Sequence, residues 1–322
     1  MTTSLYLALT VNSHISGLSS LLLSSLLLLM ILKRSVKNLA RYRGILAFSC
    51  SVDLLYAALS LLTHFTYMVF DSTMILFSTG PIVSVGPSLA RKVLCLQDSM
   101  VFLAIIVVPI SYVFRYLVIV RRLTMKTSHV ILMFSVSFVA FCGFYTSVYV
   151  VIENNLDGYE EQQKMVAREI GFEDHRGIVL MAGDVLKLDM QICLLYLYFF
   201  VVLSYTAMAY STKKILKFLR ETGSFSDHRR KLQNQLTAAL FVQAVVPLVL
   251  LVIPCLFLLF SAVLGTRLGV SVQLGSALLS WLPALNATVT LCIVSPYRKG
   301  VKAMLQRKVK ISIRFPTTSN YI

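Results

Sequence analysis

The chain has 322 residues, of which 57% are hydrophobic and 14% are charged, and its mean hydropathy is +0.78. Soluble domains average ~45–50% apolar and ~25% charged residues. This composition excludes a disordered chain and a soluble globule, whose interior could not hide so many apolar side chains from water. It predicts a protein that lies largely in lipid.

Lys and Arg outnumber Asp and Glu by 30 to 14, which gives a net charge of +16. In a soluble protein this excess would suggest nucleic acid as a partner, but in a membrane protein it reports orientation. We therefore expect no nucleic-acid partner. The six cysteines are spread widely and form no cluster with metal-ligand spacing, so we expect neither a metal nor a cofactor.

Seven mostly apolar stretches are long enough to cross ~30 Å of hydrocarbon as helices. The run from Leu21 to Leu32 lacks the alternating polarity of a membrane β-strand, which favours helices over a barrel. The sequence predicts an all-α, polytopic membrane protein, a single seven-transmembrane helix bundle. The predicted spans cover residues 9–32, 44–70, 93–120, 129–152, 190–210, 236–260 and 270–295, with a tail over 296–322.

Cationic residues alternate between the connections of these spans. Of the 30 Lys and Arg, 22 lie in the tail and in the connections after the first, third and fifth spans, Arg115 lies at the end of the third span on the same side, and seven lie in the other connections. The positive-inside rule then places the C-terminus in the cytoplasm and the N-terminus outside. The longest outer connection, Glu153–Lys187, is acidic, with eight acids against four bases.

The sequence shows no HExxH, GxSxG or Walker motif, so we expect no enzyme. Ionisable residues at membrane depth are candidate functional sites instead. Asp53 lies about ten residues into the second span, roughly 15 Å deep. Asn286 or Thr288 of the seventh span could pair with it. Either Asp53 is a structural acid held by hydrogen bonds, or it forms an intramembrane switch with Asn286.

Asp98 lies near the outer end of the third span and could neutralise a cationic ligand in an outward-facing pocket. Gln97, His64 and Tyr67 are candidates to border the same pocket. The alternative is a structural role, in which Asp98 reaches the interface or pairs with neighbouring bases, and the other three are packing or interfacial residues.

Arg115 lies 17 residues beyond Asp98, roughly 25 Å along the same helix, at the predicted cytoplasmic edge. There it could bond to hydroxyls or carbonyls of adjacent helices and be captured by a partner protein when those helices separate. Tyr116, Arg121 and Arg122 follow it and join it as candidates for the partner's contact surface. The alternative is that Arg115 only anchors the end of the helix on the cytoplasmic side, as the positive-inside rule describes.

A basic segment, Pro296–Lys308, follows the last span. Its apolar residues fall on one helical face: Tyr297, Val301, Met304 and Leu305. The pattern predicts a short amphipathic eighth helix that lies on membrane lipids of the inner leaflet.

These features together resemble a G-protein-coupled receptor, and more narrowly the nematode serpentine chemoreceptors of the Str superfamily, in its Srd-like or Str-like branches. The motifs that carry the resemblance are Asp53-Leu54-Leu55, the connection from Gly80-Pro81 to Gly86-Pro87, Phe114-Arg115-Tyr116 and Ser295-Pro296-Tyr297-Arg298-Lys299. They extend over nearly the whole chain.

The sequence departs from rhodopsin-like receptors at three places. Phe114 replaces the acid before the arginine, so no local salt bridge can hold Arg115, and Asn286 does not begin an Asn-Pro-x-x-Tyr motif. The long outer connection contains no cysteine, which leaves Cys193 as the candidate disulfide partner of Cys95.

The resemblance implies a chemosensory receptor in the plasma membrane of a sensory neuron, in its cilium. It would bind a small odorant or pheromone from outside and activate a heterotrimeric G protein inside. The alternatives are a multi-pass transporter or ligand-gated channel subunit and a non-signalling scaffold. The odd number of spans, the scarcity of midplane acids and the lack of an internal repeat argue against a transporter or channel.

Overall fold

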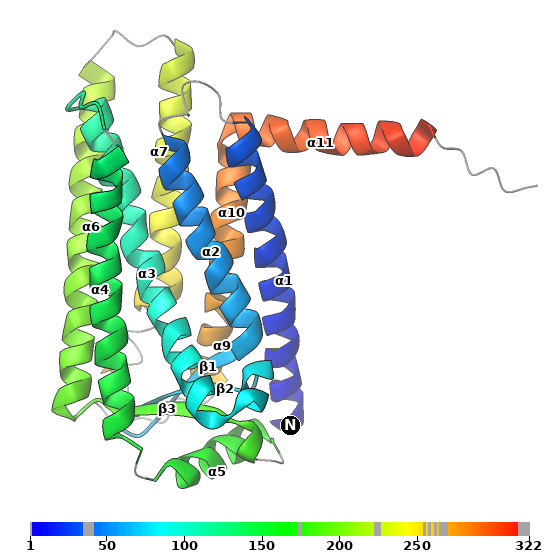
Figure 1. Cartoon of the computed structure of the whole chain (residues 1–322), viewed down its shortest axis with the longest axis vertical. Helices are drawn as coiled ribbons and strands as arrows, with labels where there is room; N and C mark the ends of the chain where they lie inside the picture. The colour runs from blue at the N-terminus through cyan, green and yellow to red at the C-terminus, as the bar shows by residue number, and fades with distance from the viewer. Residues whose placement is uncertain are drawn as a thin grey trace, which may run out of the picture.

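The computed structural model describes residues 2–34, 42–125, 127–156, 158–172, 175–221, 227–253, 256, 259–260, 263 and 270–314. It is a bundle of long, roughly parallel helices with a small sheet at one end and a helix that projects sideways from the other (Figure 1). We call these the sheet end and the α11 end. The N-terminus lies at the sheet end.

Five helices carry an apolar stretch long enough to cross a membrane. They are α1 (Thr2–Arg34), α2 (Arg43–Thr63), α3 (Pro87–Ile119), α4 (Thr127–Asn154) and α6 (Leu188–Glu221). The apolar stretch of α3 is 78% buried, against 22% for α4 and for α6. α3 is therefore the central helix, and α4 and α6 present most of their apolar surface to lipid.

The sixth and seventh spans of the bundle are divided. α7 (Asp227–Pro247) continues into a π-helical stretch, η4 (Leu248–Val252), and the remainder of the predicted sixth span lies partly outside the described residues. The seventh span consists of α9 (Val270–Leu279) and α10 (Leu282–Ile293). The chain thus forms the predicted seven-transmembrane helical bundle.

The break between α9 and α10 follows from Pro283, which sits in the first turn of α10 and has no N–H to donate. The carbonyl of Leu279, which that N–H would have bonded, instead accepts the hydroxyl of Tyr56 from α2 at 3.2 Å. A neighbouring helix therefore satisfies the carbonyl that the proline frees, as membrane helices require.

The predicted second span, residues 44–70, is too long at its C-terminal end, because α2 stops at Thr63. His64 takes the left-handed conformation (φ 43°) and its N–H bonds back to Ser60. The next residues are rich in aromatic and β-branched side chains and form β1 (Phe65–Phe70), a two-residue turn and β2 (Thr73–Ser78). Hydropathy is equally high in a buried strand, so it could not separate strand from helix here.

A third strand, β3 (Val179–Asp184), completes an antiparallel sheet of order β1–β2–β3. It comes from the long acidic connection, which also contributes helix α5 (Tyr159–Ile170). The expectation of a purely helical protein is therefore corrected at the sheet end. Two short 3₁₀ turns, Pro81–Val85 and His175–Gly177, link the elements there.

The sheet is apolar on both faces because it separates α5 from the bundle. One cross-strand row, Met68–Ile75–Ala182, packs with Val166 and Ile170 of α5. The adjacent row, Tyr67–Leu76–Met181, points the opposite way, toward α3 and α6. The sheet with α5 thus forms a lid on the bundle.

At the other end, α11 (Ser295–Arg314) turns roughly perpendicular to the bundle helices and projects sideways from the end of α10 (Figure 1). Tyr297 is fully buried and belongs to a cluster from α1, α2 and α10, against which Val301 and Met304 also pack. Lys299 and Lys302 are exposed. The predicted amphipathic eighth helix is confirmed, although the side chain of Leu305 is outside the described ones.

Candidate functional site

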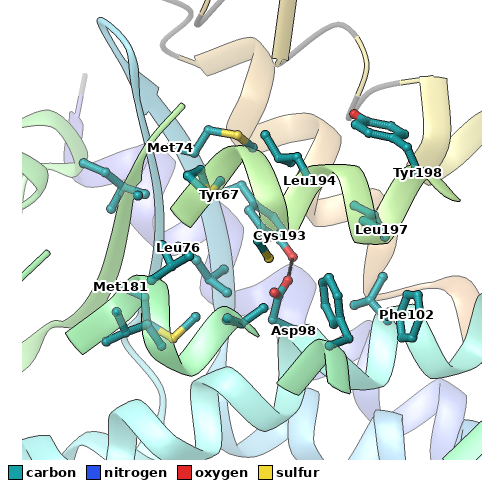
Figure 2. A pocket seen from close by; sticks show the side chains of 18 of the residues that line it. Tyr67, Met74, Leu76, Asp98, Phe102, Met181, Cys193, Leu194, Leu197 and Tyr198 are labelled. Carbon is teal, nitrogen blue, oxygen red and sulfur yellow. Dashed lines mark hydrogen bonds between the residues drawn. The ribbon is translucent and has the colours of Figure 1, made fainter. Parts of the chain in front are cut away.

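A cavity of about 140 Å³ lies between the lid and helices α3, α4 and α6 (Figure 2). Met74, Leu76 and Met181 line it from the sheet, while Phe102 and Leu197 line it from the helices. A closed apolar cavity of ~150 Å³ is large enough to hold benzene. The cavity therefore suits a molecule of about the size of one aromatic ring.

Asp98 and Tyr67 supply the polar feature of this cavity. The Tyr67 hydroxyl donates a hydrogen bond of 2.5 Å to a carboxylate oxygen of Asp98, and both side chains line the space (Figure 2). Asp98 is the one charged residue among the described residues that line it. The alternative, an ion pair of Asp98 with a neighbouring base, is not formed among the described residues, and Arg91 lies over the ring of Tyr159, 5.3 Å from its centroid.

Gln97 and His64 do not line the cavity. Successive side chains on a helix point about 100° apart, so Gln97 faces away from the space that Asp98 borders, and it is fully buried. His64 packs edge-on against His14 with 4.5 Å between ring centroids. Burial, and secondarily the neighbouring His14, lowers the pKa of His64 from its ordinary value. Of the four residues predicted to border a pocket, Tyr67 and Asp98 line this cavity, whereas His64 and Gln97 do not.

Cys95 and Cys193 are both free and buried, so the suggested disulfide is not formed. The thiol of Cys95 donates to the carbonyl of Tyr145 at 3.6 Å. The sulfur of Cys193 accepts the Ser147 hydroxyl at 3.6 Å and borders the cavity. Packing and hydrogen bonds, and no disulfide, join α3, α4 and α6 near the sheet end.

Asp53 accepts a hydrogen bond of 3.3 Å from the side-chain amide of Asn286, which links α2 to α10. Gln243 of α7 donates to the Asn286 carbonyl at 3.2 Å and to the Thr290 hydroxyl at 2.7 Å. The expected contact of Asp53 with Asn286 is present, whereas Thr288 is exposed. One polar network therefore connects three helices in the middle of the bundle.

Arg115 lies beyond this network toward the α11 end. Its side chain is 4% exposed and donates to the Thr237 hydroxyl of α7 at 3.0 Å. A small cavity next to it is bordered by Tyr42, Gln243 and Thr290. Arg115 is thus held by a hydroxyl of an adjacent helix, as the sequence suggested, and it is covered in this arrangement.

Tyr116, Arg121 and Arg122 form the surface next to Arg115. Arg121 donates through Nε to the Tyr116 hydroxyl at 3.0 Å, and Arg122 lies over the ring of Phe218 on α6, 5.9 Å from its centroid. Both arginines are exposed. The basic residues after α3 are therefore accessible, in contrast to Arg115.

Sequence reasoning missed Thr237, Gln243, Met74 and Met181. Thr237 and Gln243 are uncharged residues of α7 and carry no distinctive pattern. The methionines are placed by strand pairing over more than 100 residues, Leu76 with Met181 and Met74 with Gly183. No local signal in the sequence indicates that pairing.

Comparison with known proteins agrees with this architecture. Residues 9–302 match a family model described as serpentine type 7TM GPCR chemoreceptor Str. Squid rhodopsin has a similar structure, with a TM-score of 0.57 and 13% identity over 99% of this chain and 89% of that one. None of the curated proteins matches the chain in sequence.

Proposed function

Because the chain belongs to the Str family of serpentine seven-transmembrane chemoreceptors, we propose that its ligand binds in the cavity beneath the lid. The protein is a G-protein-coupled chemosensory receptor and spans the membrane several times. The observation that carries the proposed site is the Tyr67–Asp98 hydrogen bond inside a mostly apolar cavity. Ligand sites of this kind place a few polar groups among apolar ones to fix orientation.

The proposed ligand is a small odorant or pheromone with one cationic or hydrogen-bond-donating group. The cavity volume limits it to about one ring or a short chain. The carboxylate of Asp98 is an acceptor that would bind an ammonium group or a donor, and Tyr67 holds it in place. An apolar ligand part would contact Phe102 and the lid.

The proposed orientation has the N-terminus, the lid and the cavity on the outside. The distribution of Lys and Arg supports it, since 23 of 30, Arg115 at the end of the third span included, lie on the opposite side of the bundle. Lys299 and Lys302 of α11 would then meet anionic lipids of the cytoplasmic leaflet. The proposed location is the plasma membrane of a sensory neuron, in its cilium.

The proposed partner inside is a heterotrimeric G protein, which would contact Arg121, Arg122, Tyr116 and, after a rearrangement, Arg115. A ligand shifts the equilibrium between the inactive and the active receptor only if it binds the two states with different affinity. Since Arg115 is covered by α7 through Thr237, displacement of α7 would release it. The Asp53–Asn286–Gln243 network lies between the cavity and Arg115 and links α7 to α2 and α10.

Arg115→Ala tests the coupling part of this proposal. We expect it to abolish activation of the G protein while surface expression stays intact, as measured by nucleotide exchange and by surface labelling of an N-terminal tag on intact cells. Unchanged signalling would refute the role of Arg115. A tag that is inaccessible from outside would refute the orientation, and a ligand-gated current without G protein would favour the channel alternative.

A further inference from the structure

The cavity is unusually rich in sulfur. Four of its 22 lining residues carry a sulfur atom, whereas 18 of the 322 residues in the chain do. They are Met74, Met181, Met190 and Cys193, which come from two strands and one helix. The sequence separates them by up to 119 positions, so the fold gathers them at this one place.

Three of these residues lie on the same side of the cavity as the polar pair. Figure 2 shows Cys193 next to the Tyr67–Asp98 hydrogen bond, Met74 above it and Met181 to its left. A group anchored on Asp98 would therefore bring the rest of its molecule against thioethers. On the far side of the cavity, Phe102 stacks on Phe144 with 4.5 Å between ring centroids.

From this arrangement we infer that the receptor selects ligands whose apolar part is polarizable, an aromatic ring or a divalent sulfur, attached to the group that Asp98 binds. Thioether sulfur makes favourable contacts with aromatic rings that a saturated hydrocarbon cannot make. The Phe102–Phe144 wall favours the same ligands, because sulfur at an aromatic ring gains the same contact. This inference rests on the proposed function, whose ligand site it refines.

Gly183 helps to determine the volume that is available to such a ligand. It pairs with Met74 across the sheet, and a methyl group at its α-carbon would lie 2.9 Å from the Met190 sulfur and 3.0 Å from a methyl of Val151. Those distances are shorter than normal contacts, so a side chain here would displace Met190 or enter the cavity. Glycine thus leaves the Met190 thioether free to face the ligand.

The test uses primary amines that differ in one atom. 2-(Methylthio)ethylamine, butylamine and 2-methoxyethylamine share the ammonium group and the chain length, and they carry sulfur, carbon or oxygen at the same position. Benzylamine and cyclohexylmethylamine form a second pair. Affinities are measured by competition and by stimulated nucleotide exchange with the full receptor in lipid nanodiscs.

We expect the thioether and the aromatic amine to bind roughly two- to tenfold more tightly than their saturated partners. The Met74→Leu/Met181→Leu variant, which nearly conserves volume, should lose most of this preference and retain binding of butylamine. Met68→Leu is the matched control, because Met68 lies on the same sheet but faces α5. It should keep the preference. If the double variant does not fold, the two single variants replace it.

Equal affinities within both sets in the wild type, or a preference that survives both leucine substitutions, would overturn the inference. In either case, binding of all the amines in a manner that depends on Asp98 would leave the proposed ligand site standing. Failure of every amine to bind would remove both the proposed site and the inference.

Discussion

Arg115 on α3 and Thr237 on α7 are joined by a 3.0 Å hydrogen bond at the α11 end of the bundle. Phe114 occupies the position at which rhodopsin-like receptors carry an acid, so this receptor holds its arginine by a hydroxyl of another helix rather than by an adjacent carboxylate. The bond ties the central helix to α7 and keeps Arg115 covered.

Thr237→Val should therefore raise basal activity. The substitution keeps the shape of the side chain and removes the acceptor of a charged donor, and such bonds contribute about 1.5–3 kcal/mol. Since ~1.4 kcal/mol is a factor of ten, we expect basal nucleotide exchange to rise roughly tenfold if the bond is lost on activation. Thr288→Val, at an exposed position on α10, is the control and should leave basal exchange unchanged. Equal basal rates in both variants would show that the bond persists in the active state.

Asp98→Asn should weaken binding of cationic ligands much more than that of neutral ones. The substitution retains the size of the side chain and an acceptor oxygen but removes the negative charge from an apolar cavity, where charge interactions are strong. Dose–response curves with butylamine and with butan-1-ol measure the difference. Asp71→Asn, in the turn between β1 and β2, is a suitable control because Asn tolerates its positive φ of 51°. An identical change for both ligands would place Asp98 outside the ligand contact.

The sequence predicts the helices and the charged residues inside them, but it does not predict the lid at the sheet end. Asp53, Asp98 and Arg115 were identified because a charge in an apolar helix is conspicuous. The spans and the amphipathic helix followed from hydropathy and periodicity. The lid did not, since residues 65–70 are as hydrophobic as a span and the partner of β2 lies 100 positions away.

His64 and Gln97 show the same limit at single residues. Proximity in sequence to Tyr67 and to Asp98 suggested a shared pocket. The left-handed turn at His64 and the helical rotation between residues 97 and 98 direct both side chains elsewhere. Side-chain direction depends on backbone conformation, which hydropathy does not report.

The hydrogen bond between Asp53 and Asn286 predicts energetic coupling between α2 and α10. Asn286→Ala leaves the buried Asp53 carboxyl without this donor, and Asp53→Ala removes the carboxyl itself. A double-mutant cycle on thermal unfolding in nanodiscs should give a coupling energy of about 1–3 kcal/mol, so the double variant should be no less stable than the Asn286→Ala protein. Additive effects within ~0.5 kcal/mol would mean that the pair contributes nothing specific.

Nucleotide exchange on a purified heterotrimeric G protein, with and without amine, tests most directly that a ligand in the cavity beneath the lid drives activation. Wild-type receptor is compared with Gly183→Val, whose side chain would displace Met190 or enter the cavity, and with Gly44→Val, where an added methyl meets no atom of another element within 4 Å. We predict that amine stimulates exchange in the wild type and in Gly44→Val but not in Gly183→Val, with the same basal rate in all three. Equal stimulation in Gly183→Val and wild type would contradict the account.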